Sequence, residues 1–460
     1  MARAMALARR LALFAHIATL ADVCFASAPV DGAAGCVAEG AGSQACARLE
    51  EPDVAELLQH LGAPTVPGRQ TLLAGQQGVF RLNTIEVKGT RLYDSVTGDE
   101  FFGVGIGMPN TGDVVKDWID VLTRIKALGP NINTVRVYEL PACALATPYD
   151  RCFDVFFQEA DKLGLYVLMP GTGRTWGFWP AVEKECWEVN SKGEQYPPAT
   201  PNGCYRHGGL LGFGQEIVSR FNFPNVLAIV IGNEFDQQMS KYMPALKGYI
   251  RDLKLFMKMC HENDASPTKG YMRSIPLMYA SSDAYGDAAD ALKAQYLFCG
   301  DKEHSVDIFG LNVERWCDDT GGKIAYDGIR KWVEEGNFPG AFMFSEMGCH
   351  TLAGPRSWHQ VHDFFTNFPS FSGFWAYTYN GNKDFDMFDK PNAKGNIEVD
   401  GTNFFNSLKK IGDMTSRDPG ATVAYPSCPP EILGHTLSDY NDVEWYDTGA
   451  AGWAQSCPEP

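Results

Sequence analysis

Two glutamates at the ends of apolar runs are the residues best suited to chemistry in this chain. VLAIVIGNEF (226–235) carries Glu234, and GAFMFSEMGC (340–349) carries Glu346. Cleavage of a glycosidic bond needs one carboxylic acid to protonate the leaving oxygen and a second carboxylate to attack the anomeric carbon or activate water. We therefore expect Glu234 to be the acid/base and Glu346 the nucleophile, with carboxyl groups about 5–5.5 Å apart, as in retaining enzymes.

Apolar runs that alternate with helical patterns predict the scaffold that positions this pair. The helical patterns include 117–129, 242–260 and 328–336, where apolar residues recur with a spacing near 3.6. The candidate strands are 101–108, 133–140, 165–172, 226–234, 276–283, 305–313, 341–348 and 372–379. Eight such strands predict an α/β fold, a (β/α)8 TIM barrel, in which Glu234 ends strand four and Glu346 ends strand seven. Both would then lie at the carboxyl-terminal mouth, where barrel enzymes keep their chemistry.

Polar and aromatic side chains near the same strand ends are candidates for binding a sugar. The amide of Asn233 can hydrogen-bond a sugar 2-hydroxyl, a contact that strengthens in the transition state. Tyr138, at the end of strand two, and Tyr379, on strand eight, could hold the carboxylates and the sugar. For each tyrosine alone, packing in the core is an equally open interpretation.

Composition narrows the function classes. The chain has 460 residues, of which 45% are hydrophobic, and a formal net charge of -17. This acidity argues against nucleic acid or an anionic membrane as partner. The histidines and cysteines show no metal-site spacing, and the Gly103-x-Gly105-x-Gly107 pattern lacks the context of a dinucleotide loop. We expect neither a metal nor a cofactor.

The amino-terminal residues 1–28 read as a signal peptide, because a basic start and an apolar stretch precede Ala26-Ser27-Ala28. Cleavage there would remove Cys24 and leave twelve of the 13 cysteines, an even number that suggests disulfides. No transmembrane segment or GPI signal is evident. We expect a secreted, extracellular protein that can associate with a cell wall. Its parts would be a flexible leader (29–80), the catalytic barrel (81–412) and a carboxyl-terminal tail (413–460) tethered by a disulfide.

A long segment after strand three, residues 173–211, is rich in tryptophan and contains Cys186 and Cys204. Long loops in compact domains are usually functional or disordered. Two interpretations of this segment remain open: it forms a wall of the substrate cleft held by a disulfide, or it is a cap that buries its own aromatic side chains. Cys143 and Cys152 form a second local pair, and Cys260 is either unpaired or part of a long-range bond.

Residues 85–380 resemble the glycoside hydrolase family 72 β-1,3-glucanosyltransferases of fungal cell walls. The matching stretches are NINTVRVYEL (131–140), NVLAIVIGNEF (225–235), RSIPLMYASSD (273–283), FCGDKEHSVDIFGLN (298–312), RWC (315–317), FSEMGC (344–349) and the pattern Tyr377-x-Tyr379. The resemblance implies a retaining enzyme that cleaves and religates β-1,3-glucan chains, with the same roles for Glu234 and Glu346. It also implies active-site roles for Tyr138 and Tyr379.

The resemblance further implies two disulfides and more sugar contacts. Cys317 matches a cysteine that the family pairs with the one at Cys349, and Cys299 matches one that pairs with a carboxyl-terminal cysteine, here Cys428. The substrate-binding set expected from these stretches is Tyr138, Asn233, Asn312, Glu314, Trp375 and Tyr379.

This chain departs from the family pattern at sugar-contacting positions. Pro170 stands where the family has an aspartate, Glu314 where it has a tyrosine, and Gly107 or a neighbour where it has a glutamine. Linkage specificity and the balance between transfer and hydrolysis are therefore open. The alternatives are an endo-β-glucanase or mannanase of the same clan, and a non-catalytic glucan-binding cell-wall protein.

Overall fold

The structure is a computed structural model of the chain. It describes residues 80–109, 114–140, 152–171, 210–234, 243–262, 270, 272–283, 286–314, 324–348, 355–359, 361, 368, 370–411, 423–432, 434–437 and 457. The expected signal peptide, all but the last residue of the expected leader, and nearly all of the 173–211 segment lie outside these ranges. Their assignments stay predictions.

Eight parallel strands close into a barrel, as the alternation of apolar and helical segments predicts. The order around the barrel is β10-β11-β4-β5-β6-β7-β8-β9. The strands are β4 (Gly103–Gly107), β5 (Thr134–Arg136), β6 (Tyr166–Pro170), β7 (Val226–Asn233), β8 (Leu277–Ser282), β9 (Ile308–Val313), β10 (Ala341–Met347) and β11 (Phe371–Ala376). Each of the eight predicted strands is present, and most are shorter than predicted by a few residues.

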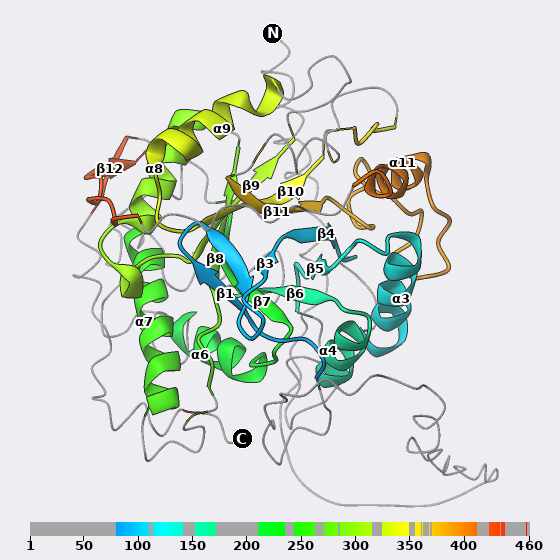
Figure 1. Cartoon of the computed structure of the whole chain (residues 1–460), viewed down its shortest axis with the longest axis horizontal. Coiled ribbons are helices and arrows are strands. Elements are labelled where there is room, and N and C mark those ends of the chain that lie inside the picture. Colours follow the sequence, from blue (N-terminus) through cyan, green and yellow to red (C-terminus); the bar gives the residue numbers. More distant parts are fainter. Residues whose placement is uncertain are drawn as a thin grey trace, which may run out of the picture. The chain divides into compact units, whose positions relative to one another are not determined.

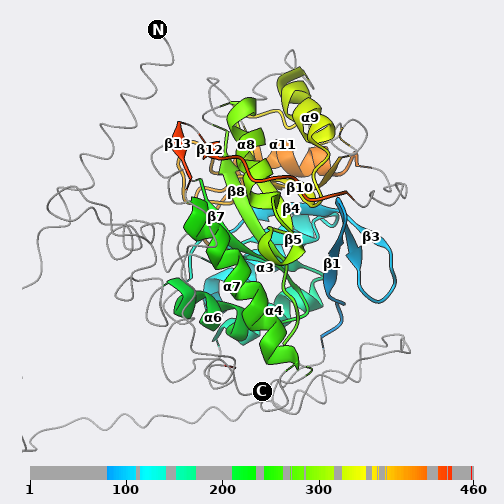
Figure 2. The ribbon, with the colours of Figure 1, turned by 90° about the vertical axis from the view of Figure 1, so that its left-hand side faces the viewer.

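Helices join the strands and surround them (Figure 1, Figure 2). They are η1 (Val114–Trp118), α3 (Ile119–Leu128), α4 (Cys152–Lys162), α6 (Leu210–Arg220), α7 (Met243–Glu262), α8 (Asp287–Phe298), η5 (Lys302–His304), α9 (Ile324–Gly336) and α11 (Val399–Leu408). The three helical patterns named from the sequence correspond to α3, α7 and α9. Among the helices that the structure describes, none combines the length and apolar composition needed to cross a bilayer.

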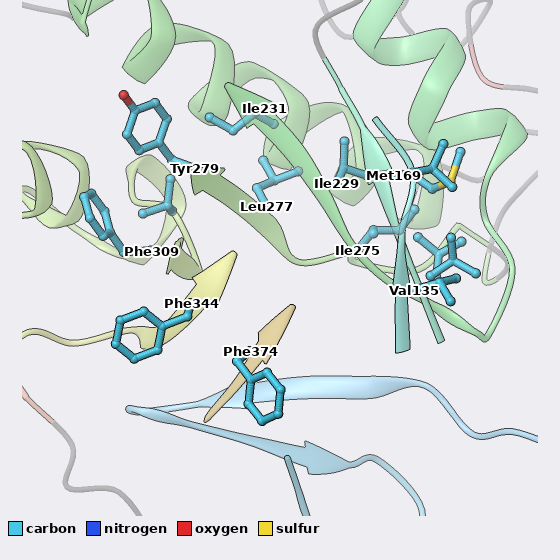
Figure 3. Packing of buried hydrophobic residues seen from close by; sticks show 14 of the residues in the cluster. Val135, Met169, Ile229, Ile231, Ile275, Leu277, Tyr279, Phe309, Phe344 and Phe374 are labelled. Carbon is cyan, nitrogen blue, oxygen red and sulfur yellow. The ribbon is translucent and has the colours of Figure 1, made fainter. Parts of the chain in front are cut away.

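Apolar side chains cover both faces of the barrel strands. In β6, Val167 and Met169 join the cluster between strands and helices, whereas Tyr166 and Leu168 join the cluster inside the barrel. Figure 3 shows part of the outer cluster, including Met169. Successive side chains of a strand point to opposite faces. A strand covered on both faces must therefore read as a continuous apolar run.

A small antiparallel sheet closes the amino-terminal end of the barrel. It consists of β1 (Ile85–Lys88), β2 (Arg91–Asp94) and β3 (Glu100–Phe101). Ile85 and Leu92 pack into the inner cluster, and the Tyr166 hydroxyl donates a hydrogen bond to the Asn83 carbonyl at 2.8 Å. Because this sheet lies at the start of the strands, the opposite, carboxyl-terminal end is left for the site.

Two disulfides tie the carboxyl-terminal region to the ends of helices. Cys299, directly after α8, pairs with Cys428, which confirms the pairing implied by the resemblance. Cys260, in α7, pairs with Cys457 and is therefore the long-range member. A short hairpin, β12 (Glu431–Ile432) and β13 (His435–Thr436), follows Cys428.

Candidate active site

Glu234 and Glu346 lie at the carboxyl-terminal ends of their strands, as predicted. Glu234 directly follows β7 and has a φ of 55°, a left-handed conformation that turns the chain out of the strand. Its side chain is half-buried. Glu346 is the last residue but one of β10 and is 6% exposed. The two carboxylates therefore sit in different environments, one reaching solvent and one inside the protein.

Arg136, at the end of β5, connects the groups around these glutamates. Its Nη1 lies 3.0 Å from Glu346 Oε1 and donates a 2.8 Å hydrogen bond to the Ser345 carbonyl. Its Nη2 donates to Asn233 Oδ1 at 2.7 Å. The contact with Glu346 lacks hydrogen-bond geometry and acts as an ion pair. One guanidinium thus contacts the ends of β7 and β10 simultaneously.

Asn312 on β9 completes this bridge. It pairs in register with Glu346, and its Nδ2 donates to Glu234 Oε1 at 2.9 Å and to Asn233 Oδ1 at 3.1 Å. Its Oδ1 accepts a 2.7 Å hydrogen bond from the Ser345 hydroxyl. The same Oδ1 also accepts from Arg136 Nη1 at 3.3 Å. Asn312 therefore fixes the orientation of Glu234, since a side chain that makes four hydrogen bonds has little freedom left.

Burial dominates the electrostatics of Glu346. It raises the pKa of this carboxyl to about 8, with Arg136 opposing the rise and the charges of Glu234 and Glu314 adding to it. Loss of hydration disfavours the charged form of a carboxyl, and neighbouring carboxylates do the same. Glu346 therefore holds its proton more tightly than an ordinary glutamate, and Arg136 limits the effect.

Two tyrosines stand beside the pair, of which one was predicted. Tyr138, just beyond β5, lies under the Arg136 guanidinium, whose central carbon is 4.5 Å from the ring centroid. Tyr377, directly after β11, meets the Tyr138 ring edge-on at 5.6 Å. Burial and the charge of Glu346 raise the pKa of both phenols. Both hydroxyls therefore stay protonated at neutral pH.

Trp375 and Tyr379 do not belong to the site, and their assignment as sugar-binding residues is wrong. Trp375 is fully buried inside the barrel, where its indole fills the space beside Gly105; a Cβ there would lie 2.2 Å from Trp375 Cδ1. Tyr379 is fully buried too. Its ring stacks on Phe388 at 4.0 Å, and its hydroxyl donates to the Asn392 carbonyl. Neither side chain can reach a substrate.

The positions that depart from the family pattern lie at strand ends near the pair. Glu314 follows β9 and is half-buried, and its charge acts on both Glu346 and Arg356. Pro170 ends β6 and is buried against β7. Gly107 ends β4, where a Cβ would lie 2.8 Å from the Tyr138 ring. A larger residue at Gly107 would therefore displace Tyr138.

Other predicted disulfides fall outside the described residues. The cysteines whose side chains lie outside the described residues are Cys143, Cys152, Cys186, Cys204, Cys317 and Cys349. Within the ranges that the structure describes, no group of three or more histidine, cysteine or acidic side chains could hold a metal ion.

The sequence interpretation missed Arg136 and Tyr377. Both stand in stretches that carried the resemblance, NTVRVYEL and the Tyr377-x-Tyr379 pattern. A charged residue inside an otherwise apolar strand, as at Arg136, is the signal that could have identified the first. For Tyr377, no sequence signal separates it from Tyr379.

Comparisons with known proteins agree with this geometry. A family model described as glucanosyltransferase matches residues 188–412. The chain is 27% identical over 384 residues to the 1,3-beta-glucanosyltransferase gel2 of Aspergillus fumigatus, covering 79% of this chain and 72% of the relative. It is 28% identical over 386 residues to the 1,3-beta-glucanosyltransferase GAS2 of Saccharomyces cerevisiae, covering 75% of this chain and 58% of that one. The solved structure of Saccharomyces cerevisiae Gas2p in complex with laminaritriose and laminaritetraose has a TM-score of 0.57 and 24% identity, and the match covers 76% of this chain and 74% of that structure.

Proposed function

We propose that this chain, which belongs to the glucanosyltransferase family (glycoside hydrolase family 72), cleaves β-1,3-glucan and joins the new chain end to a second glucan. The observation that carries the proposal is the bridge of Arg136 and Asn312, which holds Glu234 and Glu346 together at the mouth of the barrel. The names of the relatives support the reaction, and the laminari-oligosaccharides bound by Gas2p support the substrate class.

The reaction would proceed by double displacement. A Glu346 carboxylate oxygen attacks the anomeric carbon while Glu234 donates its proton to the departing glycosidic oxygen, which releases one glucan fragment. The other fragment stays bound to Glu346 as a glycosyl ester. Glu234, now a carboxylate, removes the proton from a hydroxyl of the acceptor glucan as that hydroxyl attacks the ester. The new glycosidic bond forms, and Glu346 and Glu234 return to their starting states.

The environments of the two glutamates suit these roles. Glu234 is half-buried, so its proton can exchange with leaving group, acceptor and solvent. Glu346 is buried beside Arg136, which stabilises its charged form before attack. The glycosyl ester is neutral, so the burial that disfavours the carboxylate does not disfavour the intermediate.

Neighbouring side chains would bind the sugar. Asn233 and Asn312 are hydrogen-bonded to each other beside Glu234, and Tyr138 offers an aromatic face and a protonated hydroxyl. Glu314 adds a third carboxylate, where the family pattern has tyrosine, and we assign it to substrate contact. With a glucan substrate and the relatives' fungal origin, we place the enzyme outside the cell, in contact with the wall.

Product analysis on a reduced laminari-oligosaccharide tests the proposal. The wild type should yield oligosaccharides longer than the substrate, and Glu346→Gln and Glu234→Gln should yield none. Products that are only shorter would assign an endo-glucanase instead. No turnover, with binding of the oligosaccharide retained, would assign a non-catalytic glucan-binding protein.

A further inference from the structure

Arg356, between β10 and β11, is a buried arginine that the reaction does not use directly. It is 8% exposed. Its Nη1 donates to the Tyr377 carbonyl at 2.5 Å, and its Nη2 donates to the Phe385 carbonyl at 2.8 Å. Its guanidinium lies over the Trp358 ring at 4.4 Å. One side chain thus fixes the backbone on both sides of the turn that leaves β11.

Asp400, in the first turn of α11, holds Arg356 in this position. Its Oδ2 accepts from Arg356 Nε at 2.5 Å, and its Oδ1 accepts from the Arg356 backbone N–H at 2.9 Å and from Trp358 Nε1 at 3.0 Å. The Asn403 amide donates to the Arg356 carbonyl. Because a buried charge is costly unless paired, the carboxylate and the guanidinium stabilise each other. The Asp400 carboxylate therefore holds the Arg356 guanidinium in one orientation.

Gly348 leaves the space through which the guanidinium passes. It stands two residues after Glu346, with a φ of 146°, and a Cβ there would lie 2.3 Å from Arg356 Nη1. The chain segment that carries Glu346 is thus shaped to admit Arg356. The left-handed backbone at Gly348 and the space taken by Arg356 both favour a glycine at this point.

The group that Arg356 fixes, Tyr377, lies beside the catalytic carboxylate. Its backbone N–H donates to the Met347 carbonyl at 3.0 Å, directly after Glu346. Its ring packs between Tyr138, at 5.6 Å, and Phe385, at 5.2 Å. The carbonyl held by Arg356 belongs to the same residue, so the guanidinium fixes the backbone from which the Tyr377 phenol projects.

We propose that Arg356, clamped by Asp400, is a positioning residue that holds the Tyr377 phenol against Tyr138 at the end of β10 that carries Glu346, where its hydroxyl acts in the chemical step. The inference rests on the proposed function, since it concerns the rate of that reaction. The Tyr377 phenol stays protonated, and its pKa responds to the charge of Glu346, the carboxylate that must gain and lose a covalent bond. A displaced hydroxyl would slow bond formation and leave the remote binding of glucan intact.

Steady-state transfer kinetics on the reduced laminari-oligosaccharide test this with a matched control. Arg356→Lys should lower kcat by about 10- to 100-fold, as expected for a misplaced reacting group, and change KM less than about threefold. Asp400→Asn, which keeps Arg356 and the shape of its partner, should lower kcat in the same direction. Arg124→Lys is the control, because Arg124 also donates to two carbonyls, those of Ala393 and Gly395, without contacting Tyr377.

A double-mutant cycle separates positioning from general stability. In a Tyr377→Phe background, Arg356→Lys should cost less than about twofold in kcat, because the group it positions is already absent. The same factor in both backgrounds, or an equal loss in Arg124→Lys, would overturn the proposal. Glu346-dependent turnover by the wild type is the separate check on the proposed function. If the wild type shows no turnover, the proposed function and the role of Arg356 are both refuted. If the wild type is active but the losses from Arg356→Lys and Tyr377→Phe simply multiply, only the role of Arg356 is refuted.

Discussion

Replacing Glu346 by Gln should make the protein more stable, by an amount that depends on pH. The substitution keeps the size of a buried side chain and removes its titration. In the folded protein, burial raises the pKa of Glu346 from 4.5 to about 8, and the unfolded chain returns the carboxyl to water. An ionised Glu346 therefore lowers the free energy of unfolding, whereas a glutamine at this position carries no charge and does not.

The sign follows from which state holds the proton. Between pH 4.5 and 8 the folded protein keeps a proton that the unfolded chain has lost, so the free energy of unfolding falls as pH rises. The slope is about 1.4 kcal/mol per pH unit, and the total approaches roughly 5 kcal/mol by pH 8. The stability difference between Glu346→Gln and the wild type should therefore widen by roughly 2–3 kcal/mol from pH 5 to pH 7.

Urea unfolding followed by tryptophan fluorescence, at pH 5 and pH 7 with disulfides intact, measures this difference. Asp94→Asn is the control. Burial raises the pKa of Asp94, but hydrogen bonds from the backbone N–H groups of Thr97 and Val96 and from Asn83 outweigh it and lower the pKa below 3.8. The ionised Asp94 carboxylate stabilises the folded protein at every pH above about 3.8, and this stability is lost only at lower pH. The loss of stability in Asp94→Asn should therefore be equal at pH 5 and pH 7. A Glu346→Gln difference that is constant or narrows between these pH values would refute the reasoning.

Further predictions concern rate and stability. On an aryl laminari-oligosaccharide whose leaving group needs no proton from Glu234, kcat/KM should rise with pH toward about 8, because the attacking Glu346 must lose its proton, and a profile flat from pH 5 to 8 would contradict this. Asn312→Ala should lower kcat about tenfold or more by freeing Glu234, measured as initial transfer rate; an unchanged rate would remove Asn312 from the site. Replacing Cys299 and Cys428 by Ser should lower the free energy of unfolding by about 2–5 kcal/mol without changing kcat of the folded protein, as urea titration and kinetics can show; unaltered stability would contradict it.

The barrel and its catalytic pair could be predicted from the sequence because both depend on local pattern. A strand buried on both faces must be apolar throughout, so the runs before Glu234 and Glu346 mark strands without any knowledge of their neighbours. In a parallel barrel all strand ends meet at one mouth. The last polar residue of each run is then placed at the site by topology alone.

The contacts within the site were decided by the tertiary structure. Arg136 joins the ends of β5, β7 and β10, which lie far apart in the chain, and no spacing in the sequence states that its guanidinium reaches Asn233 and Glu346 together. The pairing of Cys260 with Cys457, across 197 residues, is of the same kind.

The direction of side chains on β11 and just after it could not be predicted from the sequence either. A uniformly apolar strand carries no alternation that tells the inner face from the outer one. Trp375 therefore could not be distinguished as an indole buried inside the barrel, nor Tyr377 as the phenol beside Glu346 with Tyr379 turned into the core. The sequence determined that strands and carboxylates exist and where each strand ends. Closure of the barrel, which sets the facing partner of every side chain, decided which residues meet at the site.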